Sequence, residues 1–313
     1  MLPRSFASLW MTLICAFFTA CSTTKNLPEG EILYTGIDKL EVVNEDKTLA
    51  GVTALTEVEA ALAYAPNNAI LGSSSLRWPI PFGLWVYNGF EKYQDKKGVG
   101  RWIFDHLGKS PVLMSSVNGE TRAKVATNLL RDYGYFNGSV SYQEVPQKNP
   151  KEAKVSYVID MAQPYFLDSI AYLRYPHYAD SLIRSTHSQS VLKSGENFSV
   201  LKLEEERQRL SSLFRNHGYY YYRPEFTTYR ADTLQKPGYV SLQVVPRNGV
   251  PTEARKQYYI GKTSVYLTGY NDELPTDTLR LRTMDIYYSG KKPGIRPSAL
   301  MRNFFFRKGE LFS

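Results

Sequence analysis

The sequence has little of what disulfide-stabilised and metal-dependent proteins carry. Its 313 residues include only two cysteines and four histidines. Two cysteines cannot form the disulfide framework of a small secreted domain. The histidines are scattered without the spacing of a metal site, at positions 106, 177, 187 and 217. After residue 20 there is no run of about 20 apolar residues, the length that a membrane-spanning helix needs.

Motifs of the common enzyme classes are also missing, and we expect no cofactor, no metal and no catalytic residues. The sequence has neither a G-x-S-x-G elbow nor an H-E-x-x-H motif. Residues Gly261–Ser264 imitate the end of a phosphate-binding loop, but Lys256 stands where that loop requires glycine. Glu204–Arg209 places several carboxylates on a predicted helix, where we expect a solvated face with local ion pairs.

The first 20 residues are predicted to be a lipoprotein signal peptide. Arg4 precedes an apolar run, Leu9–Ala20, of about a dozen residues, which is too short to cross a bilayer but typical of a signal sequence. The run ends in Phe-Thr-Ala-Cys, which resembles a bacterial lipobox with phenylalanine in place of the usual leucine. We therefore expect acylation of Cys21, followed by a linker over residues 21–30. The alternative is an ordinary signal peptide in which Cys21 is incidental.

Export also bears on the net charge of +8 and on the 24 tyrosines. The Tyr-rich stretch Gly218–Phe226 would suit base stacking, but an exported chain rarely meets nucleic acid, so no nucleic-acid partner is expected. The charge could favour an acidic membrane surface or acidic partners. A solvated surface with modest excess charge is the simpler interpretation.

The mature sequence contains an internal repeat. Residues 129–135 read LLRDYGY and residues 213–219 read LFRNHGY, each after apolar residues at helical spacing. Gly134 and Gly218 follow the last turn, where a left-handed C-cap favours glycine. Two strands are predicted after each copy, over 139–145 and 155–159 in the first, and over 220–228 and 240–244 in the second.

A third copy begins but does not finish. Leu192–Ser199 reads LKSGENFS, with Ser199 as a predicted helix N-cap, and Phe306–Ser313 reads FRKGELFS. The unit thus reads β-α-α-β-β, an α+β fold with a three-stranded mixed sheet and two helices on one face. The predicted domains are residues 31–163, 164–253 and an incomplete unit at 254–313.

The first unit carries an insertion at about residues 66–116. It contains three tryptophans, Trp78, Trp85 and Trp102. So long an interruption is either a functional loop or a small subdomain. We expect its aromatic residues to pack the insertion onto its own domain rather than to form a ligand platform.

A β-α-α-β-β unit with G-E-x-F-S before its second helix and G-Y-[FY] after it resembles the POTRA domain of the BamA/TamA superfamily. The lipobox, the stretch CSTTKNLPEGEILYTG, the PNNAILG segment at Pro66–Gly72 and the GKSPVL segment at Gly108–Leu113 resemble its TamL-like lipoprotein branch. This family carries a C-terminal β-barrel that this sequence does not show. The resemblance implies tandem POTRA domains facing the periplasm, held at the outer membrane by a lipid anchor. It also implies unfolded outer-membrane β-barrel proteins as partners, and an inner-membrane TamB-like partner.

The resemblance suggests how clients bind. In POTRA domains the first strand of the hairpin lies at a sheet edge, whose unpaired backbone groups can accept a client strand. The residues expected there are Ser139, Ser141, Gln143, Tyr220, Tyr222 and Pro224. In the alternative interpretation of the tyrosines, they pack under the helices or are merely exposed. Alternatives to the whole function are a free-standing envelope lipoprotein scaffold for protein docking and a periplasmic hydrolase with an unrecognised site.

Overall fold

The structure is a computed structural model that describes residues 23–268, 274–304 and 307–313. The predicted signal peptide and Cys21 lie outside the described residues. The chain divides into two compact units, Met1–Tyr165 and Phe166–Ser313.

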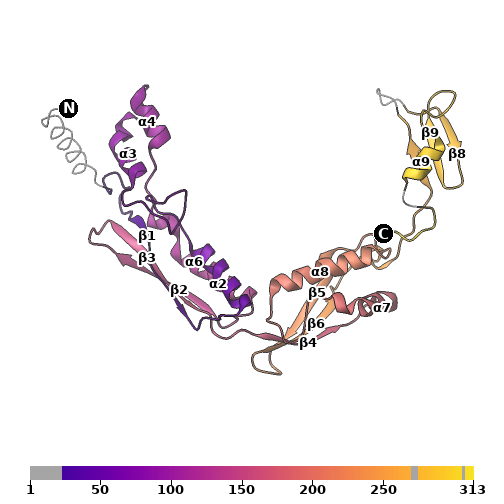
Figure 1. The fold of residues 1–313 in the computed structure, drawn as a ribbon, viewed down its shortest axis with the longest axis horizontal. Helices are drawn as coiled ribbons and strands as arrows, with labels where there is room; N and C mark the ends of the chain where they lie inside the picture. The colour runs from indigo at the N-terminus through magenta and orange to yellow at the C-terminus, as the bar shows by residue number, and fades with distance from the viewer. Residues whose placement is uncertain (1–22, 269–273, 305–306) are drawn as a thin grey trace, which may run out of the picture. The chain divides into compact units, whose positions relative to one another are not determined.

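The first unit contains a three-stranded mixed sheet. Its strands are β1 (Leu33–Val43), β2 (Ser139–Pro146) and β3 (Glu152–Asp160), in the order β1-β3-β2. Strand β1 runs parallel to β3 and β2 runs antiparallel to it. Helices α2 (Leu49–Leu62) and α6 (Gly119–Asp132) cover one face of this sheet, as Figure 1 shows.

The core lies between that sheet face and the two helices. Alternate residues of β3 are buried because successive side chains of a strand point to opposite faces. The helices contribute small and branched residues at spacings of three and four, which place them on one side of each helix. The central buried residues are Ala54, Val58, Leu62, Ala126, Leu130, Val155, Tyr157 and Ile159.

The insertion forms a helical hairpin followed by a short helical turn. Its elements are α3 (Phe82–Phe90), η1 (Glu91–Tyr93), α4 (Val99–Leu107) and α5 (Met114–Val117). Leu84 of α3 is completely buried. The expectation that the tryptophans bury themselves against the domain was wrong for two of them, since Trp78 and Trp102 are mostly exposed.

The second unit repeats the topology of the first. Strands β4 (Phe166–Tyr172), β5 (Thr227–Asp232) and β6 (Tyr239–Pro246) pair in the order β4-β6-β5, again one parallel and one antiparallel pair. Helices α7 (His177–Ser185) and α8 (Val200–Arg215) lie over one face of this sheet (Figure 1). Short 3-10 turns accompany them, η2 (His187–Gln189), η3 (Pro224–Phe226) and η4 (Glu253–Arg255). The predicted α+β fold class is therefore confirmed.

The predicted helix ends are present in both repeats. Gly134 and Gly218 adopt φ of 91° and 93°. The next residue in each copy reaches back five positions, so that Tyr135 N–H donates to the Leu130 carbonyl and Tyr219 N–H to the Phe214 carbonyl. This is the Schellman motif, which needs a residue without Cβ at its left-handed position. Ser199 caps α8 by accepting a hydrogen bond from the N–H of Lys202.

The two G-E-x-F segments make the same backbone hydrogen bonds. In the second sheet, Leu167 N–H donates to the Glu196 carbonyl, and Gly195 N–H donates to the Leu167 carbonyl. Near the end of the chain, Ile260 N–H donates to Glu310, and Gly309 N–H donates to Ile260. The repeated letters thus correspond to the same short antiparallel bridge beside a first strand.

The residues between the second unit and the G-E-L-F-S segment near the end of the chain hold an unexpected hairpin. Strands β7 (Thr263–Tyr266), β8 (Asp277–Arg280) and β9 (Met284–Tyr288) form a third mixed sheet, in the order β7-β9-β8. Among the residues described after β9, one short helix follows, α9 (Pro297–Asn303). The expectation of a helical stretch directly after the first strand of this unit was therefore wrong, because a β-hairpin comes first.

The expectation of a solvated face at Glu204–Arg209 was wrong at one position. Glu206 is fully buried and makes a two-pronged ion pair with Arg209. Its carboxylate also accepts hydrogen bonds from the Tyr172 hydroxyl and the Val191 N–H. This buried network ties α8 to β4.

Candidate functional site

The outer edge of β2 carries the first group of predicted client-binding residues. Ser139, Ser141 and Gln143 lie on this strand and are exposed. Their side chains are on the sheet face opposite the helices, because the alternating residues Val140 and Tyr142 face the core. Since β2 pairs only with β3 in its sheet, its other side is a free edge.

The hydrogen bonds show which backbone groups of β2 point outward. Val140 N–H donates to the Thr127 hydroxyl of α6 at 2.9 Å, so this residue faces away from β3. Gln147 N–H donates to the Glu152 carbonyl, so odd-numbered positions face the sheet. Because antiparallel pairs alternate between bonded and non-bonded positions, the outward groups include those of Tyr142 and Glu144.

The free edge of β2 is therefore short. At one end the N–H of Val140 already donates a hydrogen bond to the Thr127 hydroxyl. At the other end the outward position is Pro146, which has no N–H. Two outward N–H groups remain between these ends, on Tyr142 and Glu144. This edge can bond a few residues of an added strand and no more.

The opposite edge of the same sheet is partly covered by the insertion. Arg77 donates to the carbonyls of Thr35 and Ile37 on β1, at 3.4 and 3.3 Å. Gly36, between them, has φ of 118°, and a Cβ there would come within 2.3 Å of the Arg77 guanidinium. The insertion thus occupies β1 carbonyls that another strand would need.

The other predicted client-binding residues do not lie on an edge strand of the second sheet. Strand β5 begins at Thr227, not at Tyr220, so the placement of Tyr220, Tyr222 and Pro224 on an edge strand was wrong. Tyr222 is buried, with its hydroxyl 2.9 Å from that of Thr227. Pro224 begins the turn η3. The sequence contained a signal against this strand, because Pro224 lies within it and proline disfavours the interior of a strand.

Tyr220 is exposed but has aromatic neighbours. Its ring lies 4.7 Å from that of Phe312 and 4.8 Å from that of Tyr221, both edge-on. Such pairs are favourable beyond the area they bury. The tyrosine run therefore splits into two buried members, Tyr219 and Tyr222, and an exposed aromatic cluster.

The edge of β5 itself is formed by residues that were not singled out. Arg247 N–H donates to the Phe226 carbonyl, which sets the alternation so that Thr227, Tyr229 and Ala231 point their backbone groups outward. The Tyr229 hydroxyl donates to the Leu203 carbonyl of α8 at 2.6 Å. This edge therefore borders α8, as the β2 edge borders α6.

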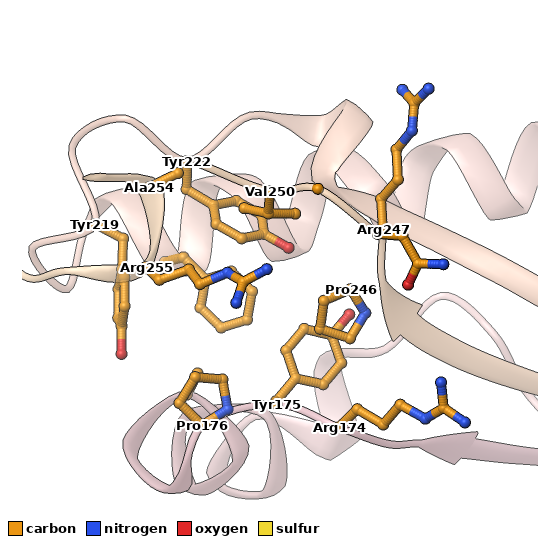
Figure 2. Close-up of a pocket in the computed structure, with 14 residues that line it drawn as sticks. Arg174, Tyr175, Pro176, Tyr219, Tyr222, Pro246, Arg247, Val250, Ala254 and Arg255 are labelled. Carbon is orange, nitrogen blue, oxygen red and sulfur yellow. The ribbon is translucent and has the colours of Figure 1, made fainter. Parts of the chain in front are cut away.

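A pocket of about 290 Å³ lies at one end of the second sheet. Figure 2 shows aromatic and apolar side chains around it, with Arg255 directed across it and with Arg174 and Arg247 at its rim. Among the salt bridges of residues 23–268, none involves these three arginines. Arg174 also has φ of 65°, a conformation that costs energy in a residue with a side chain.

The tyrosine side chains that line the pocket are uncharged at neutral pH. Burial raises the pKa of Tyr222 to about 12, and burial likewise raises the pKa of Tyr175. The positive charge is thus confined to the arginines. Apolar walls with guanidinium groups nearby suit a ligand that joins an apolar group to an anionic one.

Within the described part of the chain, no group of three or more His, Cys, Asp or Glu side chains is placed to hold a metal ion. None of its helices has both the length and the apolar character needed to cross a bilayer.

Comparisons with known proteins give structural neighbours only. No protein-family model matches the chain, and no curated protein matches it. The chain is similar to POTRA domains 3–5 of BamA from Haemophilus influenzae, at 9% identity over 92% of this chain and 83% of that one, with a TM-score of 0.35. It is also similar to POTRA domains 1–3 of the periplasmic domain of Omp85 from Anabaena, at 12% identity over 91% and 81%, with a TM-score of 0.29.

A third neighbour is the N-terminal domain of Omp85 from Thermosynechococcus elongatus. It shares 12% identity over 90% of this chain and 80% of that one, with a TM-score of 0.27. The fold assignment rests on the strand order, pairing and helix placement of the individual sheets rather than on these superpositions.

Proposed function

We propose that this chain is a periplasmic POTRA scaffold that receives unfolded outer-membrane proteins by strand addition and guides them to a membrane-inserting barrel. One observation carries the proposal. The β2 edge keeps two outward N–H groups free, between a position closed by Thr127 and one closed by Pro146. Backbone pairing makes little demand on the sequence of the client, which suits a receptor for many barrel proteins.

The proposal includes the location of the scaffold. We propose that Cys21 is acylated and holds the chain at the outer membrane with its domains in the periplasm. Each buried CH₂ of an acyl chain is worth about 0.8 kcal/mol, so two or three chains anchor a protein stably. Mass spectrometry of the membrane-extracted protein tests this part, since an unmodified Cys21 would contradict it. An inner-membrane TamB-like partner belongs to the same proposal.

Client capture can be tested at the edge itself. A photo-crosslinking residue at Gln143, on the free edge, is expected to capture a urea-denatured barrel protein on dilution. The matched control is the same residue at Lys39, which is exposed on β1, the other edge strand of the sheet. Equal capture at both positions would contradict strand addition at β2.

A proline substitution sharpens the test. Glu144→Pro removes an outward N–H without removing a β3 hydrogen bond, so the fold is expected to survive. One lost hydrogen bond of about 1 kcal/mol, together with the bulk of the ring, predicts client capture at least about fivefold weaker. Glu144→Thr keeps the N–H and is the control.

The same assay separates the alternative function. A docking scaffold for folded envelope proteins would capture folded partners, and Glu144→Pro would not change that capture. Undiminished capture of unfolded clients by Glu144→Pro, with the fold intact by circular dichroism, would overturn the edge mechanism.

A further inference from the structure

The insertion exposes an unusual number of large apolar side chains. Leu71, Trp78, Phe82 and Leu107 surround one open hollow of about 660 Å³. Trp102 stacks on His106, which also lines the hollow, at 4.9 Å between ring centres. We call these five apolar residues the insertion apolar surface. Contiguous exposed apolar patches on a soluble domain mark an interaction site.

The turn at Leu71–Gly72 in the insertion combines a strained backbone with an exposed apolar side chain. Leu71 is completely exposed and has φ of 50°, followed by Gly72 with φ of 79°. Hairpin turns with two such residues favour Asn-Gly or Gly-Gly, because a side chain with a Cβ is strained there. Because the Leu71 side chain is fully exposed, burial within this chain does not stabilise it. A contact with something outside the chain better explains a leucine at this position.

Helix α4 adds to this surface. None of its nine residues is buried, although they include both Trp102 and Leu107. A helix that exposes tryptophan and leucine suits a membrane interface, and the single arginine of α4, Arg101, pairs with Asp105 of the same helix. Residues 66–116 contain six Lys or Arg against three Asp or Glu, an excess that attracts anionic headgroups.

The first described residues, which follow the predicted lipid anchor in the sequence, are held against this insertion. Asn88 of α3 is buried and donates from its side chain to the Thr23 carbonyl at 3.2 Å, while Asn26 donates to the Asn88 carbonyl at 3.2 Å. Thr23 is thereby fixed against the insertion. Thr23 is two positions after Cys21 in the sequence, a reach of at most about 7 Å. An acylated Cys21 would hold the membrane surface close to α3.

From these contacts we infer that the insertion apolar surface binds the lipid bilayer that holds the anchor, as a second, interfacial attachment. The occupant is a membrane with anionic lipids, contacted by the apolar side chains and flanked by lysine and arginine. The inference rests on the lipid anchor of the proposed function. Its consequence is that the first domain is held at a fixed orientation to the membrane, rather than swinging on a linker.

Vesicle binding tests the inference without the anchor. The mature chain with Cys21→Ser would be mixed with vesicles of three parts phosphatidylethanolamine and one part phosphatidylglycerol. Its three tryptophans all lie in the insertion, so their fluorescence reports on this region. We expect a blue shift, quenching by brominated lipids, and co-sedimentation that weakens in neutral phosphatidylcholine vesicles.

Two variants identify the surface. Leu71→Asn places a residue that favours the left-handed turn, so the fold should not suffer. We expect it to bind vesicles several-fold more weakly, and Leu71→Asn/Phe82→Gln at least tenfold more weakly. The control is Leu234→Asn, which removes an equally exposed leucine from the second unit and should bind as the parent does.

The outcomes are distinct. No blue shift and no co-sedimentation with either vesicle would overturn the inference, as would equal loss in the Leu234→Asn control. A dimer of the chain, seen by analytical ultracentrifugation and lost in Leu71→Asn, with no vesicle binding, would assign the surface to a second copy and also overturn it. Client crosslinking at Gln143 does not depend on any of these results, so the two proposals can fail separately.

Discussion

The buried ion pair between Glu206 and Arg209 offers the sharpest test of the second domain. Arg209 donates to both carboxylate oxygens of Glu206, one of them from Nε at 2.9 Å. Substitution of Arg209 by methionine keeps most of the volume and removes both charged donors. Glu206, with no exposed surface, then keeps only the Tyr172 hydroxyl at 2.6 Å and the Val191 N–H at 3.2 Å.

The cost can be bounded from these contacts. Removing one partner of a buried ion pair typically costs 3–5 kcal/mol, because the other charge stays buried without compensation. The two remaining donors place Arg209→Met at the lower end, near about 3 kcal/mol. A second change, Glu206→Gln, removes the buried charge while keeping an acceptor. The double variant is therefore expected to recover most of the loss, to within about 1 kcal/mol of the parent.

The assay must report on this domain alone, because the chain has several and a single unfolding midpoint would mix them. Hydrogen exchange resolved by peptide does so. Exchange should accelerate in α8 and β4 of Arg209→Met, revert in the double variant, and stay unchanged in β2 and β3. If Arg209→Met loses less than about 1 kcal/mol, or if the double variant is no better, the buried pair is not the link between α8 and β4.

Three further predictions follow from single contacts. Gly218→Ala should destabilise the second domain by about 1–2 kcal/mol, because alanine is strained at the left-handed φ of this position. It should also loosen the end of the chain, since the new Cβ would meet Leu311 at 2.6 Å. Hydrogen-exchange protection measures both effects. Ser199→Ala should cost about 1 kcal/mol by removing the N-cap of α8, measured by hydrogen exchange of the α8 peptides, and Ser199→Asp should restore it. Burial acts to raise the pKa of Asp46, but hydrogen bonds from the Tyr135 hydroxyl and Thr48 outweigh it and lower the pKa below 3.8. The stability that Asp46 contributes is therefore present above pH 3.8 and is lost as the pH falls through its folded-state pKa. Asp46→Asn should flatten this acid limb in a pH series of exchange protection measured on peptides of the first unit.

The sequence by itself determined the repeated architecture of this protein. Gly134, Gly218 and Ser199 are local signals, because a left-handed C-cap and an N-cap depend on the residue at one position and on its neighbours in the chain. The α+β class followed from the order of the predicted elements, whereas the edge position of β2 was implied by the resemblance to POTRA domains.

Tertiary structure decided the rest. Whether Tyr222 is in a strand or buried in a turn, and whether Glu206 faces water or Tyr172, depends on which elements pack against them. The free groups of β2 depend on Thr127, and the covered carbonyls of β1 depend on Arg77, both supplied from other parts of the chain. The exposure of Trp78 and Trp102 is likewise a property of packing. Aromatic composition gives the energy available for burial, but only the fold determines which surfaces are left for water or for a membrane.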